Sequence, residues 1–299
     1  MKHPVSLLFL ITLIIAQPVL AQKSSGSAKP LSGLYLFVDA GLLVPNSKQA
    51  NFYDGRNNRP NTINRVLHSE AYGSQIWNDL VSQQLISPSA IPDYNAFQVA
   101  EYANMYYKLT YQLGLGFRYV YDNGFGWLVR FDYSQVNAAG QFLLSSDNGT
   151  GILGRDQYVT CGIYGVEKRM LIDFALTQRV RLTPNMDLEL DLGFDVNNTK
   201  VSAHNMRIGG HDYSILDVWN GQSPYVGISP YEYINQGAIG IGAFASLAFS
   251  YRINSSAIDF GYTLYSIQTK YRDYNEDDSY AFQHNVFVRF NINNFSFFK

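Results

Sequence analysis

Residues 108–121, KLTYQLGLGFRYVY, carry the clearest evidence of how this chain folds. Apolar and aromatic side chains occupy every second position, and polar or small residues lie between them. Successive side chains of a β-strand point to opposite faces, so the segment predicts a strand with one apolar face and one polar face. The apolar face comprises Leu109, Tyr111, Leu113, Leu115, Phe117 and Tyr119, and the other face contains Lys108, Thr110, Gln112 and Arg118.

Seven further segments repeat this alternation. They are residues 33–44, 125–135, 167–182, 188–196, 237–252, 258–265 and 280–292. Connections after the second, fourth and sixth segments are tight, and the others are long. Bacterial outer-membrane barrels have short periplasmic turns and longer external loops. The pattern therefore predicts an all-β fold, a transmembrane antiparallel up-and-down β-barrel of eight strands with long extracellular loops. Ten strands are the alternative, with additions from residues 94–106 or 158–166.

The composition fits a membrane barrel better than a soluble sandwich. The chain has 23 tyrosines and 19 phenylalanines, yet its mean hydropathy is −0.13. A soluble antiparallel sandwich also alternates apolar and polar residues. However, no charge falls in the eight apolar phases, where a lipid-facing Arg or Lys would cost about 2–4 kcal/mol at the midplane. These phases also carry aromatic residues near the strand ends, as the interfaces of a membrane barrel require, at Tyr107, Tyr119, Trp127, Tyr133 and Tyr251. The net charge of −2 offers no basic surface for nucleic acid.

The first residues predict export. Lys2 and His3 precede the apolar run 5–16, and the small-residue site VLA follows at 19–21. This predicts a signal peptide at 1–21, a flexible periplasmic lead-in at 22–32 and the barrel domain at 33–299. The run is too short for a membrane-spanning helix, which needs about 20 residues. Together with the strand pattern, this predicts an integral protein of the bacterial outer membrane. Both termini would be periplasmic, because the number of strands is even.

The segment pattern resembles the small outer-membrane barrels of the OmpA/OmpX type, and the Tyr- and Asn-rich loops resemble proteins of Bacteroidota. The resemblance covers residues 33–292. Unlike OmpA, no peptidoglycan-binding domain follows the last strand, and the aromatic end NFSFFK at 294–299 resembles a barrel-assembly signal. The leading hypothesis is a non-enzymatic barrel whose long surface loops bind a partner protein, a polysaccharide or an envelope machine. The resemblance implies an accessory role in type IX secretion or outer-membrane assembly.

The polar faces predict the barrel interior. The lumen of an eight-stranded barrel is just wide enough for side chains, and an isolated buried ion is very costly. We therefore expect a network of ion pairs and no open pore. Its predicted members are Arg118, Arg130, Asp132, Asp173, Arg179, Glu189, Asp191, Arg252, Asp259 and Arg289.

The long connections contain the other candidate residues. A short helix is predicted at residues 75–86, with Ser74 as its N-cap and Pro88 just beyond its end. It would either cover the barrel mouth, which we favour, or bind a partner. Exposed aromatics are enriched in recognition surfaces, although loop aromatics equally pack within loops. The candidate recognition surface comprises Trp77, Trp219, Tyr225, Tyr231 and Tyr233.

No catalytic, cofactor or metal motif is recognisable. The acidic run EDD at 276–278 would suit Ca²⁺ only weakly. His211, Asp212 and Ser214 are residue types found in hydrolases, so a surface hydrolase of the lipid A deacylase or omptin kind is one alternative. A narrow diffusion channel is another. The expected partners are outer-membrane lipid, lipopolysaccharide and an envelope protein, without nucleic acid.

Overall fold

The computed structural model describes residues 32–56, 62–70, 72–82, 97–146, 157–216, 236–253, 256–271 and 280–292. The predicted signal peptide, residues 276–278 and 294–299, and four predicted recognition residues lie outside these ranges. Those four are Trp219, Tyr225, Tyr231 and Tyr233.

Eight strands form a closed antiparallel barrel. Each pairs with the next along the chain, and the last pairs with the first, so that Val38 lies opposite Phe290. The predicted eight-stranded fold is confirmed, and neither 94–106 nor 158–166 adds a strand to the ring. The strands are β1 (Gly33–Val44), β4 (Thr110–Val120), β5 (Phe125–Ser146), β6 (Gln157–Thr183), β7 (Met186–Ile208), β9 (Ile239–Ile253), β10 (Ser256–Ile267) and β11 (Ala281–Ile292).

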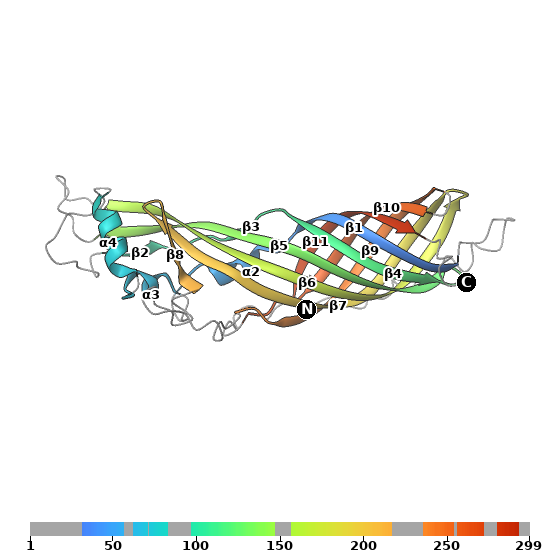
Figure 1. Ribbon diagram of the computed structural model, residues 1–299, viewed down its shortest axis with the longest axis horizontal. Coiled ribbons are helices and arrows are strands. Elements are labelled where there is room, and N and C mark those ends of the chain that lie inside the picture. Colours follow the sequence, from blue (N-terminus) through green and yellow to red (C-terminus); the bar gives the residue numbers. More distant parts are fainter. Residues whose placement is uncertain are drawn as a thin grey trace, which may run out of the picture.

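Three of the strands are far longer than a membrane requires. β6 has 27 residues and β7 has 23, whereas about 9–11 residues cross the hydrocarbon core. β5, β6 and β7 continue together beyond the barrel along the length of the molecule (Figure 1). The predicted loops after residues 135 and 196 are therefore wrong in their first parts. The sheet continues there because β5 and β6 remain paired up to Ser146 and Gln157.

We call the part beyond the barrel the extension. It comprises residues 136–146 of β5, 157–166 of β6 and 201–208 of β7, with the shorter elements packed on them. The short strands are β2 (Phe97–Glu101) and β3 (Tyr106–Tyr107), which pair with β5, and β8 (His211–Ser214), which pairs with β7. The helices are α2 (Ser47–Ala50), the 3₁₀ turn η1 (Asn51–Tyr53), α3 (Ile63–Leu67) and α4 (Gly73–Ser82).

The polarity of the two sheet faces inverts where the barrel becomes the extension. On β5 the outward phase is apolar up to Tyr133 and polar at Gln135 and Asn137. The inward phase changes the other way, from buried Asp132 to buried Val136. Only alternate strand residues face lipid, so this inversion marks the edge of the lipid-facing band.

The helices cover the inner face of the extension and create a second hydrophobic core, distinct from the apolar cluster inside the barrel. α4 places Ile76, Trp77 and Leu80 in this core. The helix predicted at 75–86 is confirmed in place but begins at Gly73, so Ser74 lies inside it and is not its N-cap. No helix in the described ranges has both the length and the hydropathy to span a membrane.

The connections at the opposite end of the barrel are tight, as predicted. Between β4 and β5 the chain reverses within four residues, and Gly124 adopts φ of 80°, which favours glycine. Thr183 pairs directly with Met186 across the next turn. Both Gly33, opposite Val120, and Ile292 lie at this end, so the first and last barrel strands begin and end beside the tight turns.

Candidate functional site: the charged lumen, the extension and its outer groove

The lumen holds the predicted charges in contact with one another. All ten predicted residues point inward, and each lies within 4.0 Å of an opposite charge. Arg118 is central, because it contacts Glu189, Asp191 at 3.0 Å and Asp259 at 4.0 Å. Glu189 also accepts a hydrogen bond from Arg179. The inward phase of the strands brings these groups together along the barrel axis.

A second group of ion pairs lies nearer the extension. Arg130 contacts Asp132 at 2.9 Å and Asp173 at 2.5 Å, and it donates to the hydroxyl of Tyr265. A guanidinium held by several carboxylates satisfies most of its donors. An internal cavity beside Tyr265 has a volume of about 10 Å³, which suits one water molecule. The described interior is therefore filled by side chains here.

The sequence pattern missed one member of the lumen, whereas it places Asp39 correctly in the inward phase. Asp187 is buried and pairs with Arg252 at 2.9 Å and Arg181 at 3.5 Å. Asp39, which alternates correctly on β1, lies 3.4 Å from Arg289. Asp187 follows a turn so closely that the alternation had not yet been established, although its inward phase with Glu189 was a usable signal.

A buried carboxylate joins the lumen to the extension. Glu167 accepts hydrogen bonds from Tyr53 at 2.9 Å, Tyr271 at 2.8 Å and Arg169 at 2.6 Å. Burial raises the pKa of the Tyr53 and Tyr271 hydroxyls, so both remain protonated donors. These residues come from η1, from β6 and from the segment after β10. The contacts therefore tie two chain connections to the wall where the sheet polarity inverts.

One predicted interfacial aromatic residue lies elsewhere. Tyr107 was expected among the outward-facing aromatics at the strand ends, but it is only 8% exposed. Its hydroxyl lies 2.9 Å from that of Tyr271, and its ring packs under Arg169. The prediction was wrong because residues 106–107 form the separate strand β3, so the alternation read through from 108–121 does not continue back to them.

Trp77 does not contribute to a recognition surface. Its side chain is 3% exposed within the extension core, on the buried face of α4. The helix therefore covers the inner face of the extension, and the expectation that it would cover the barrel mouth is wrong. Of the predicted recognition residues, Trp77 alone lies within the described ranges.

His211 and Asp212 do not form a catalytic pair. They are neighbours on β8, so their side chains point to opposite faces. His211 Nδ1 lies 2.8 Å from Asp79 of α4, whereas Asp212 accepts two hydrogen bonds from Arg207, at 2.7 and 2.8 Å. The Arg207 hydrogen bonds lower the pKa of Asp212. Both groups hold β8 in place, which offers no support for a hydrolase centred on them.

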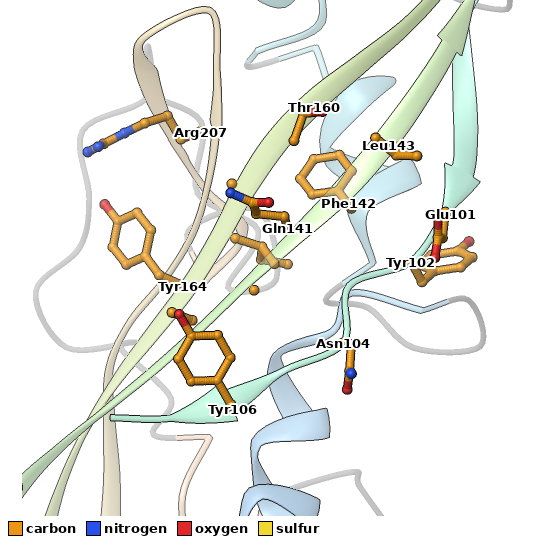
Figure 2. Close-up of a pocket in the computed structure, with 14 residues that line it drawn as sticks. Glu101, Tyr102, Asn104, Tyr106, Gln141, Phe142, Leu143, Thr160, Tyr164 and Arg207 are labelled. Atoms are coloured by element: carbon orange, nitrogen blue, oxygen red, sulfur yellow. The ribbon is translucent and has the colours of Figure 1, made fainter. Parts of the chain in front are cut away.

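The outer face of the extension contains an open groove of about 720 Å³. It lies where the chain between β2 and β3 runs alongside β5, and Figure 2 shows its side chains. Tyr106, which is 51% exposed, lies on one side of the groove, and Gln141 lies at the bottom of the groove. Tyr164 projects from β6 and donates to Asp212 at 2.9 Å. Asn104 and Thr160 add further polar groups.

Below the groove, two lysines face each other on the outside of the wall. Lys168 of β6 lies directly opposite Lys200 of β7, and both are exposed. Gln135 of β5 completes the row. Below them on β6 comes Met170, which is 54% exposed on the lipid-facing band. The sequence pattern missed this pair. Lys168 shares the outward phase of Met170, so the expectation that no charge falls in the apolar phase is wrong at the start of residues 167–182. Lys200 lies beyond the predicted end of its segment at residue 196.

Comparisons with solved structures return small outer-membrane barrels. The chain is similar to Neisserial surface protein A (10% identity, 88% of this chain and 98% of the other, TM-score 0.39). It is also similar to OprG from Pseudomonas aeruginosa (12%, 88% and 97%, TM-score 0.40). A third is the attachment invasion locus protein Ail of Yersinia pestis, crystallised with the heparin analogue sucrose octasulfate (10%, 88% and 100%, TM-score 0.34).

The sequence matches no protein-family model and no curated protein. With identities and TM-scores this low, the assignment of an eight-stranded barrel rests on the strand pairing of the chain itself.

Proposed function

We propose that the protein is an integral barrel of the bacterial outer membrane that presents its extension to a partner protein of the envelope, without catalysing a reaction. In this proposal both termini and the tight turns face the periplasm, and the extension stands outside the cell. The inversion of face polarity supports a membrane-embedded barrel. The partner would belong to type IX secretion or outer-membrane assembly in Bacteroidota, as the sequence resemblance implies.

The separate hydrophobic core of the extension is the observation that carries this proposal. Loops without a core would lose conformational entropy on binding a partner, and that cost reduces affinity. Here three long strands and four helical segments bury a continuous cluster that includes Trp77 and Phe142. The extension therefore offers a preformed surface, held at a fixed position above the membrane.

The filled lumen argues against the diffusion channel. Arg118, Arg130 and Arg289 are each at most 1% exposed, and each reaches a carboxylate on a strand with which its own strand does not pair. An ion would have to displace these charge-assisted contacts to pass. Planar-bilayer recording of the purified protein should show no steady conductance.

Orientation is tested with single cysteines. Cys161 is the only natural cysteine and is buried, so the natural protein should show little labelling by the maleimide. We expect Tyr158→Cys, at a site 59% exposed in the extension, to react with a membrane-impermeant maleimide on intact cells. Asp122→Cys, in an exposed tight turn, is the matched control and should react only after permeabilisation. The reverse pattern would refute the proposed orientation.

The partner is tested by site-specific photo-crosslinking in native membranes. A photoreactive residue at Tyr158 should give one dominant protein adduct that co-purifies in mild detergent. The same residue at Leu113, which is 60% exposed on the lipid-facing band, should give none. No adduct from several exposed positions of the extension would contradict a protein partner.

A further inference from the structure

Within the part of the chain that the structure describes, the lysine pair above the lipid-facing band has no acidic partner. Like charges directly opposite each other on neighbouring strands destabilise a sheet. Lys168 and Lys200 occupy such a position, and no acidic side chain of the described residues forms an ion pair with either ammonium group. Gln135 beside them can donate further hydrogen bonds. A multiply charged oxyanion such as phosphate would relieve the repulsion and use these donors together.

The groove of Tyr106 and Tyr164 lies directly above this row. Tyr164 and Lys168 share the outward phase of β6, four residues apart, which corresponds to roughly 13 Å along a strand. Tyrosine rings offer flat apolar faces with a polar edge. The side chains of Gln141 and Asn104 provide amide donors and acceptors. Sugar rings present the complementary surfaces, namely apolar C–H faces and hydroxyl edges.

The vertical order of these surfaces selects one ligand. From the membrane outward, the wall presents an apolar band ending at Met170, then the Lys168–Lys200 pair, then the tyrosine groove. A phosphorylated glycolipid presents acyl chains, phosphates and sugars in that same order.

We propose that Lys168, Lys200 and the tyrosine groove bind the phosphate and sugar headgroup of an outer-leaflet glycolipid. In the cell this site rests on the proposed orientation, with the extension outside. A free phosphorylated polysaccharide would share the headgroup chemistry but would lack the acyl chains on the apolar wall. The two sources are therefore separated by comparing acylated and deacylated ligands.

The experiment measures binding to the purified full-length protein in detergent micelles, by native mass spectrometry with titration. The probes are a bis-phosphorylated lipid A with core sugars, the same molecule after phosphatase treatment, its deacylated oligosaccharide, and lipid A without core sugars. We expect saturable one-to-one binding of the first probe, at least tenfold tighter than the second. The third should also bind more weakly than the first.

Two variants locate the site. Lys168→Gln with Lys200→Gln should weaken binding of the first probe by about tenfold or more, because each basic residue near a charged headgroup contributes a few-fold. Tyr106→Ala should weaken binding of the first probe several-fold but leave lipid A without core sugars unchanged. Lys48→Gln, at an exposed lysine of α2, is the control and should bind as the natural protein does.

The results separate cleanly. Equal binding by the natural protein and the double lysine variant would overturn the proposal, as would equal binding of the phosphorylated and dephosphorylated probes. Equal binding of the deacylated oligosaccharide would overturn the membrane glycolipid as its source. Heat-dependent mobility on gels confirms that each variant is a folded barrel. Because the assay needs neither a partner nor a cell, it can succeed or fail independently of the proposed function.

Discussion

Protonation of His204 should open the extension while leaving the barrel intact. His204 is fully buried on β7, with its ring packed edge-on against Tyr53 at a centroid distance of 5.0 Å. Its Nε2 lies 3.2 Å from the Tyr53 carbonyl oxygen, which the neutral ring can satisfy as a donor. Nδ1 has no hydrogen-bond partner among the described atoms. Burial lowers the pKa of His204 to about 4, against about 6.5 in an unfolded chain.

The sign and the size of the change in stability of the extension follow from this difference in pKa. Between pH 6.5 and 4 the unfolded extension binds a proton on His204 that the folded extension does not, so stability falls as the pH falls. The two pKa values differ by about 2.5 units, at 1.36 kcal/mol each, which gives a loss of roughly 3 kcal/mol by pH 4. The equilibrium for opening should therefore rise by roughly 10²–10³-fold.

The Cys161 thiol gives a direct assay, because it is the only cysteine and lies in the extension core. Its labelling rate with dithiodipyridine, normalised at each pH to the urea-unfolded protein, reports local opening. His204→Phe keeps an aromatic ring in the core but removes the titrating group, so its protection of Cys161 should vary much less between pH 6.5 and 4. Parallel pH profiles for the variant and the natural protein would refute the reasoning.

Three further perturbations test the packing. Trp77→Ala should destabilise the extension by about 3–5 kcal/mol. Proteolysis of the extension should become faster, while the heat-modifiability of the barrel stays unchanged; loss of the barrel would contradict two separate cores. Gly165→Ala should cost about 1–3 kcal/mol, because an added Cβ would lie 2.1 Å from the Tyr53 ring, and hydrogen exchange of β6 should show it. Glu189→Gln should cost about 3–5 kcal/mol in urea unfolding from lipid vesicles, since it leaves two buried guanidinium groups with fewer carboxylates; an unchanged midpoint would argue against a stabilising network.

Alternation alone predicted the barrel because one physical rule holds throughout it. Wherever lipid lies outside, the outward phase must be apolar, and the narrow lumen then receives the polar phase. Arg118 and Asp191 could be assigned to the lumen from their positions in that alternation. Their individual partners could not, because contacts across a lumen depend on strand stagger and side-chain length, which no segment encodes alone.

The same rule explains why the strand ends were missed. β5 was predicted to end at Gln135, where the outward phase stops being apolar, yet it continues to Ser146. Beyond the membrane the outward face meets water and the inward face meets helices, so the pattern reverses while the strand persists. Reading for a reversed alternation after Gln135 would have found the added length. The long-range packing of α4 on this sheet would still have been inaccessible.

The inversion also limits how far the barrel can move relative to the membrane. If the wall sank by two residues, Lys168 and Lys200 would enter the hydrocarbon edge, at a cost of up to about 1 kcal/mol each near the interface and about 2–4 kcal/mol each at the midplane. If it rose by two residues, Met170 and Tyr133 would lose their contact with lipid. The lysine pair therefore sits at one depth, where anionic headgroups lie. In the proposed orientation, that depth would hold the tyrosine groove about 13 Å farther out, at the level expected for the sugars of the proposed glycolipid.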